Sequence, residues 1–183
     1  MASLGYAAAS ASGTTLTVYG PTGANLASLT CYTSWAGCDS FIASAPTTGT
    51  YSLVVTPPTS TSITGGAVTL STPLAGTINV GDPAQVVAIS RTGQTARYAF
   101  SGTAGQLLRV NWGAASLDPS PGVSVSVSVL KPDGTTLSSG SFSNGSTSGF
   151  DVAALPGTGT YTLVFDPSQA VTMSASVSLV TRP

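Results

Sequence analysis

The sequence contains no histidine and no glutamate, and Lys131 is its single lysine. Five basic and six acidic residues give a net charge of −1, and charged residues make up 6% of the chain, where a soluble domain usually carries about 25%. Without histidine, a Ser-His-Asp or Cys-His catalytic arrangement cannot form, and a zinc site loses its most common ligand. The balance of charges also excludes a basic surface that binds nucleic acid.

Residues that favour helices are also scarce, since glutamate is absent and lysine, glutamine and arginine are few. No segment repeats apolar residues with the helical period over three turns, and no apolar run reaches the roughly 18 residues that span a membrane. Valine, threonine and tyrosine favour strands, while 21 glycines and 12 prolines divide the chain into short segments. We therefore expect an all-β protein without membrane insertion.

The first residues, 1–6, lack both the basic region and the apolar region of a signal peptide. Either the protein is not secreted, or the chain is a piece or mature form whose export signal lies elsewhere. Low charge combined with abundant serine, threonine and glycine favours the second alternative. The expected location is extracellular or at the cell surface.

Two cysteines, Cys31 and Cys38, enclose six residues. In an oxidising compartment they are expected to form a disulfide that closes this loop. The alternative is a pair of buried or merely adjacent thiols.

An internal repeat organises the chain. The segment 46–55 (PTTGTYSLVV) recurs 110 positions later as 156–165 (PGTGTYTLVF), and 16–23 recurs 111 positions later as 127–134. The difference of one residue falls between these blocks, where the Cys31–Cys38 loop replaces the Ser/Gly/Asn-rich stretch 138–149. Two copies of one unit therefore account for nearly all of the chain.

The residue pattern of each unit predicts β-strands. Residues 123–129 alternate valine with serine, which places the valines on one face of a strand, and a Pro-Asp-Gly turn follows. Further strands are expected at 76–80, 86–90, 96–100, 107–112, 159–165 and 171–179. The sequence predicts two tandem antiparallel β-sandwich modules with wet outer faces.

The two modules differ in completeness. The second, 74–183, has its full set of strands, whereas the first, 1–73, has only residues 1–12 ahead of its matching hairpin and lacks its opening strands. Three explanations remain open: the chain begins inside a longer repeat array, the first module is a shortened variant, or a neighbouring chain supplies the strands. In the last case, strand sharing would generate a homo-oligomer or filament through the incomplete first module.

Residues 93–106 (GQTARYAFSGTAGQ), followed by 131–134 (KPDG), 156–163 and Asp166-Pro167, resemble β-sandwich repeats of large bacterial secreted or cell-surface proteins. Such repeats often occur with RHS/YD-type repeats and are similar to pre-peptidase C-terminal domains. The resemblance covers 74–183 fully and 12–72 in part; Thr56-Pro57 replaces Asp-Pro in the first module. It implies spacer or accessory modules.

The aspartates suggest no chemistry. Asp82, Asp118, Asp133 and Asp166 each lie beside proline or glycine, where capping of a turn explains them. No catalytic residue, metal site or cofactor is predicted, and the protein is not expected to be an enzyme. The one alternative is a calcium site that uses Asp118, Asp133 or Asp151 with backbone carbonyls.

The loop between the cysteines carries two aromatic residues, Tyr32 and Trp35. Aromatic faces stack on sugar rings, so these residues are the candidate ligand-binding pair, and a disulfide would stiffen the loop in advance. The alternative is that Trp35 packs inward and fills the incomplete module. Trp112 is expected to pack in the core or at a sheet edge, and the repeated Tyr51 and Tyr161 are expected to be structural.

The predicted function is therefore a non-catalytic structural or adhesive repeat module that self-assembles by strand sharing. The alternative is a carbohydrate-binding module that uses Tyr32 and Trp35. The expected partners are further copies of the chain or a polysaccharide, and neither nucleic acid nor a membrane.

Overall fold

In the computed structural model the chain is all-β, as predicted, and the described residues include no helix. The structure describes residues 2–8, 13–32, 38–42, 45, 47–63, 66–119 and 122–183. The chain divides into two compact units. The first comprises Met1–Pro73, Arg91–Gln94 and Ser168–Val171, and the second comprises Leu74–Ser90, Thr95–Pro167 and Thr172–Pro183.

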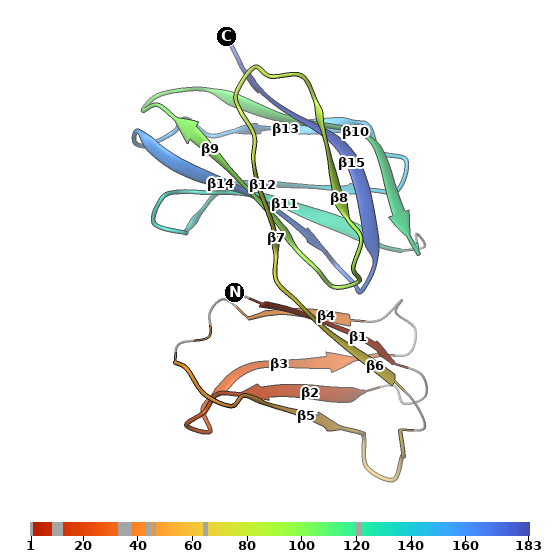
Figure 1. Cartoon of the computed structure of the whole chain (residues 1–183). Helices are drawn as coiled ribbons and strands as arrows, with labels where there is room; N and C mark the ends of the chain where they lie inside the picture. The colour runs from red at the N-terminus through yellow and green to blue at the C-terminus, as the bar shows by residue number, and fades with distance from the viewer. Residues whose placement is uncertain are drawn as a thin grey trace. The chain divides into compact units, whose positions relative to one another are not determined.

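The first unit contains two three-stranded antiparallel sheets, ordered β4-β1-β6 and β3-β2-β5. The strands are β1 (Ala2–Ala8), β2 (Thr14–Tyr19), β3 (Asn25–Cys31), β4 (Cys38–Ile42), β5 (Ser52–Thr56) and β6 (Gly66–Ser71). The two sheets form two layers in Figure 1. Leu16, Val18 and Cys31 are the buried centre of this unit, and Leu29 and Val55 pack against them.

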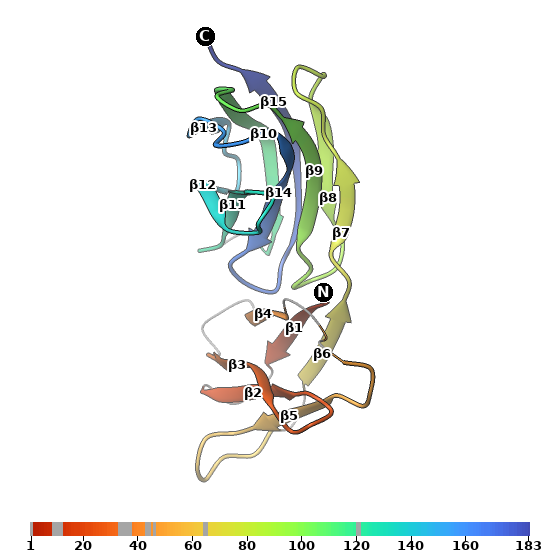
Figure 2. The same cartoon turned by 90° about the vertical axis from the view of Figure 1, so that its left-hand side faces the viewer.

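The second unit contains a four-stranded sheet, β13-β10-β15-β8, and a five-stranded sheet, β12-β11-β14-β9-β7. Its strands are β7 (Leu74–Thr77), β8 (Gln85–Ile89), β9 (Ala96–Gly102), β10 (Leu108–Asp118), β11 (Ser124–Leu130), β12 (Thr136–Ser143), β13 (Ser148–Val152), β14 (Gly159–Pro167) and β15 (Thr172–Thr181). The strand pairs of this unit are antiparallel except β7 with β9, which are parallel. The layers of the two sheets are visible in the turned view (Figure 2).

Period-two alternation builds the core of the second unit. Along β11, Val125, Val127 and Val129 are fully buried, while the serines between them are partly or fully exposed. Alternate residues of β14 and β15 are buried in the same way. A sheet with one apolar face must cover it with a second layer, so the sequence pattern accounts for the sandwich.

Aromatic side chains fill one part of this core. Trp112 is buried, with ring centroids 5.4 Å from Phe142 and 6.0 Å from Phe150. Gly140 lies beside Phe150, and a Cβ atom there would stand 2.6 Å from the Phe150 ring. The prediction that Trp112 packs in the core is confirmed.

The hairpins at the repeated sequence blocks have the same register. Leu16 pairs with Leu29 in the first unit, and Val127, 111 positions after Leu16, pairs with Gly140. Both hairpins carry an irregularity at the same place, between Val18 and Tyr19 in the first unit and at the matching position of β11. The hydrogen bonds that close the two turns also recur at this spacing.

A tyrosine hydrogen bond recurs as well. The Tyr161 hydroxyl donates to the carbonyl of Gly157 (2.7 Å) and accepts from its amide (3.3 Å). Tyr51 makes the same two bonds with Thr47 in the first unit. A tyrosine that bonds the backbone a few residues upstream is a known device of β-sandwiches, and this confirms the structural role expected for both tyrosines.

The other sheet also repeats its order, because β4-β1-β6 corresponds to β13-β10-β15. Tyr6 of β1 lies opposite Val68 of β6, just as Trp112 of β10 lies opposite Val177 of β15. The described residues of 1–73 form no counterpart of β7, β8 or β9. The division into two tandem modules at 1–73 and 74–183 stays a prediction, supported by these correspondences.

One detail of the sequence interpretation is wrong. The strand expected at 76–80 is β7, which begins at Leu74 and ends at Thr77, and Val80 makes only an isolated bridge before the chain turns at Gly81 (φ 88°). Strands β12 and β13 occupy most of the stretch 138–149. Strand β1 is the counterpart of β10, so the opening strands that the first module was predicted to lack correspond to β7, β8 and β9.

Replacing Tyr161 with Phe should lower the free energy of unfolding by about 1 kcal/mol, because the half-buried amide and carbonyl of Gly157 lose their partner. The measurement is urea unfolding. Tyr51→Phe is the matched control, and its loss should be smaller because water can reach the corresponding bond. Equal losses in the two variants would contradict this account.

Candidate functional site

The aromatic loop joins the two sheets of the first unit. Cys31 is the last residue of β3, and Cys38 is the first residue of β4. The Cys31 side chain is buried, and the Tyr32 side chain next to it is 44% exposed. Trp35 lies outside the described residues, as does the Cys38 side chain, so the disulfide and the placement of Trp35 stay predictions.

The position of Cys31 has a counterpart in the second unit. Cys31 stands at the position of Phe142, which packs against Trp112. The Trp112 indole donates a hydrogen bond to the Ser146 hydroxyl (3.3 Å), which lies in the loop between β12 and β13. In both units this loop therefore starts from a buried position.

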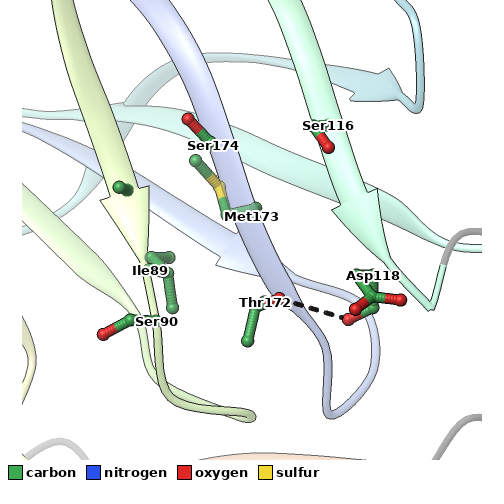
Figure 3. Close-up of a pocket in the computed structure, with 8 residues that line it drawn as sticks. Ile89, Ser90, Ser116, Asp118, Thr172, Met173 and Ser174 are labelled. Atoms are coloured by element: carbon green, nitrogen blue, oxygen red, sulfur yellow. Dashed lines mark hydrogen bonds between the residues drawn. The ribbon is translucent and has the colours of Figure 1, made fainter.

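A shallow hollow of about 340 Å³ lies on the four-stranded sheet of the second unit (Figure 3). Its lining comes from β8, β15 and the end of β10: Ala88, Ile89, Ser90, Ser116, Asp118, Thr172, Met173 and Ser174. The hydroxyl of Thr172 lies 3.4 Å from the carbonyl oxygen of Asp118. These residues offer hydroxyls and one carboxylate, which can hydrogen-bond a polar molecule.

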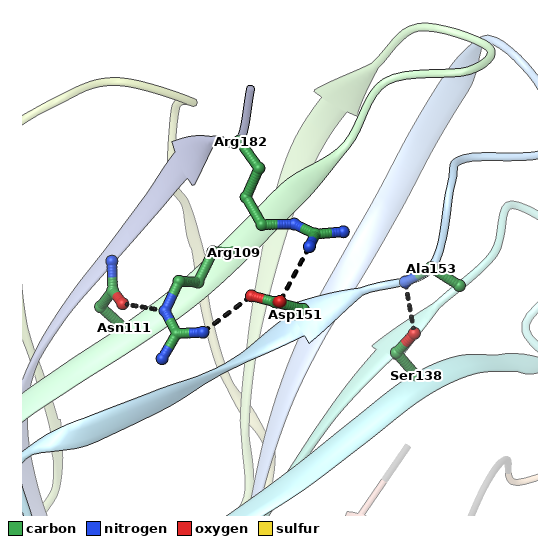
Figure 4. A network of polar contacts seen from close by, with 6 residues as sticks. All are labelled: Arg109, Asn111, Ser138, Asp151, Ala153 and Arg182. Carbon is green, nitrogen blue, oxygen red and sulfur yellow. Dashed lines mark hydrogen bonds and ion pairs between the residues drawn. The ribbon is translucent and has the colours of Figure 1, made fainter.

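One carboxylate bridges two arginines. Asp151 on β13 accepts from Arg109 on β10 (2.7 Å) and from Arg182 just after β15 (2.8 Å), and the Arg109 Nε donates to Asn111 (2.9 Å) (Figure 4). All three charged side chains are partly exposed, so the pairs contribute little stability in water. Both Asp151 oxygens have a guanidinium partner, which argues against Asp151 as a calcium ligand.

The remaining aspartates have structural positions. Asp133 accepts from the hydroxyl (2.6 Å) and amide (2.9 Å) of Thr135, and these bonds, helped by Lys131, lower the Asp133 pKa. Asp82 accepts from Asn79. The turn role is thus confirmed for Asp133.

For Asp166 the turn prediction is wrong. Asp166 lies within β14, because strand pairing continues to the proline that follows it. Asp118 is the last residue of β10, beside the proline at which the strand ends. Burial raises the pKa of Asp166. Burial therefore disfavours the ionised form of this carboxyl in the folded second unit.

The structure brings no metal-binding group together: among the described residues, no three or more of His, Cys, Asp and Glu form a cluster. None of the described elements is a helix long and apolar enough to cross a membrane. The sequence interpretation did not identify the hollow or the Arg–Asp–Arg cluster. Arg109 and Asp151 meet only because β10 pairs with β13.

Residues 94–165 match the family model of the bacterial pre-peptidase C-terminal domain. The match runs from just before β9 into β14, and it supports the expected resemblance for this part of the chain. The association with RHS/YD-type repeats stays a prediction.

Two solved structures are similar to part of the chain. The pre-peptidase C-terminal domain of a collagenase from Bacillus anthracis is 15% identical, with a TM-score of 0.42, over 59% of this chain and 96% of that chain. PliG from Aeromonas hydrophila, a periplasmic inhibitor of g-type lysozyme, is 22% identical, with a TM-score of 0.38, over 59% of this chain and 99% of that chain. No curated protein matches the chain.

Asp166→Asn should stabilise the protein at pH 7 relative to the wild type. Burial raises the Asp166 pKa in the folded state, so the folded protein holds this proton more tightly than the unfolded chain. The wild type therefore loses stability as pH rises from the unfolded pKa through the folded pKa, and the neutral amide removes this loss. Thermal unfolding at pH 3 and pH 7 measures the difference.

Asp133→Asn is the control of opposite sign, since the Asp133 pKa is lowered and its carboxylate form is favoured by folding. Compared with the wild type, this variant should lose more stability at pH 7 than at pH 3. A gain for Asp166→Asn that is the same at both pH values would show that its carboxyl charge is not the cause.

Proposed function

We propose that the chain is a non-catalytic structural module of a bacterial extracellular or cell-surface protein, made of two tandem related units. The observation that carries the proposal is the family-model match at 94–165, since pre-peptidase C-terminal domains are non-catalytic parts of secreted bacterial proteins. The shared strand order and registers of the two units support their common origin.

The use of polar groups supports a structural role. Tyr161, Asp133 and Asp151 each bond to neighbouring turns or strands of the scaffold, where they fix its shape. The charge-poor surface is made instead of hydroxyl groups from alternating serines and threonines. Such a surface suits a spacer or adhesive module that touches other surfaces without strong charge preference.

We include the Cys31–Cys38 disulfide in this proposal. Cys31 is buried at the end of β3, and Cys38 opens the next strand, so the bond would join the two sheets of the first unit. A loop of this size would contribute about 2–3 kcal/mol by restricting the unfolded chain.

Native-state digestion with trypsin tests the structural role. Arg97 and Arg109 lie within strands, so they are cut only when the second unit opens, and cleavage at them should be very slow in the folded protein. Fast cleavage at both sites would contradict a durable module. The double variant Cys31→Ser, Cys38→Ser is the matched test of the bond: it should leave the rate at these arginines unchanged and speed chymotryptic cleavage at Tyr32.

A second candidate function is carbohydrate binding by the aromatic loop. The observation that favours it is the exposed Tyr32, whose ring offers a face for stacking on a sugar. Trp35 would be the second platform of the same loop.

Under this second function, Tyr32→Ala and Trp35→Ala should each abolish pull-down of the chain by insoluble polysaccharides while the thermal unfolding temperature stays unchanged. Thr22→Ala, in the exposed turn after β2, is the matched control and should bind as the wild type does. Pull-down that survives both aromatic substitutions, or loss of the fold in Trp35→Ala, would remove the loop as a binding site.

A further inference from the structure

Three apolar side chains of the first unit are exposed although the pairing register gives them buried counterparts in the second unit. They lie on the last strand of each sheet, β5 or β6, and their exposed fractions are 37% for Leu53, 41% for Val68 and 61% for Leu70. Their counterparts by pairing register in the second unit, Leu163, Val177 and Leu179, are fully buried.

The difference has a direct structural cause. In the second unit, β14 pairs with β9 and β15 pairs with β8, so each sheet continues beyond the strand that carries Leu163 or Val177 and Leu179. In the first unit, β5 and β6 end the sheets formed by the described residues, and no further strand covers them there. Both open edges lie on the side of the first unit away from β3 and β4, because β3 and β4 are the opposite end strands of the two sheets and contact each other.

Neither open edge carries the usual protection. The sequences of β5 (SLVVT) and β6 (GAVTLS) contain no charge and no proline, which are the common devices against strand pairing. An uncharged edge with exposed apolar residues is a template for an added strand.

We infer that the first unit binds a pair of extended strands with the chemistry of this chain's own β8 and β9, supplied by another polypeptide segment. The second unit defines the required pattern. One strand presents alternating aliphatic residues, as Val87 and Ile89 do beside β15, and the other presents an aromatic residue, as Phe100 does where it stacks on Tyr161 at 5.5 Å. In the first unit, Tyr51 makes the same backbone bonds as Tyr161, so its ring is the counterpart on which such an aromatic residue would stack.

A second copy paired edge to edge is the competing occupant. It would extend each sheet, but it would bring only the short strands β5 and β6, without an aromatic residue for Tyr51. The same scaffold in the second unit is completed by a β8–β9 pair, and this favours a segment of that type. The inference rests on the proposed structural role and adds a partner to it. If strand binding fails, the module can still be non-catalytic and resistant to proteases, so the two proposals can be tested separately.

The experiment adds strands of the β7–β9 type ahead of the first unit. A copy of residues 74–107 is fused directly before Ala2, because Ala2 is the register counterpart of Leu108, so the connection keeps the length it has in the second unit. Amide hydrogen exchange in β5 and β6 is compared between the extended and the original chain. The extended chain should exchange at least about tenfold more slowly there.

The control is the same extension with Val87→Ser, Ile89→Ser and Phe100→Ser in the copied segment only, and it should give no protection. The inference is overturned if the extension leaves exchange unchanged, or if the control protects equally well. It is also overturned if the original chain sediments as a dimer with β5 and β6 already protected, since a second copy is then the occupant.

Discussion

The structure depends on one constraint: in each sheet, the apolar residues on the inner face of the last strand must be shielded from water. A strand with period-two alternation has one apolar face, and that face is stable only where a facing sheet and a neighbouring strand keep water away. In the second unit β8 and β9 complete both sheets, and Leu163, Val177 and Leu179 are fully buried. In the first unit the described residues form no counterpart of β8 in one sheet and none of β9 and β7 in the other, and the buried cluster among them is a few residues around Leu16.

The near absence of charge follows the same logic. Hydroxyl groups on the outer face satisfy water without requiring ion pairs, so the few charged residues serve local structure: Asp133 orders a turn, and Asp151 ties Arg109 to Arg182 across paired strands. Asp166 is the exception, since burial within β14 disfavours its charged form. A scaffold of this kind offers little acid–base chemistry and much repeated backbone geometry, which fits a module that acts by its shape.

Much of the fold could be predicted from the sequence, because alternation is a local signal. The Val/Ser pattern at 123–129 predicted β11, and the Pro-Asp-Gly turn after it was found where expected. The strand β13 was missed because SGFDV shows no alternation and follows a glycine-rich stretch, so only its pairing with β10 defines it. Asp166-Pro167 suggested a turn, yet pairing with β11 carries the strand through both residues. Arg109 and Asp151 are far apart in the sequence, and only the strand register brings them into contact. The spacing of the two cysteines allowed an aromatic loop to be proposed, but it did not predict where the side chains of that loop lie.

The most direct test of the common scaffold is nuclear Overhauser contact between backbone protons of paired strands. The account predicts contacts of Leu16 with Leu29 and Val55 in the first unit, in the same register as those of Val127 with Gly140 and Phe165 in the second. A register shifted by even one residue in the first unit would turn its inward residues outward, and such a shift would contradict the claim that one scaffold is used twice.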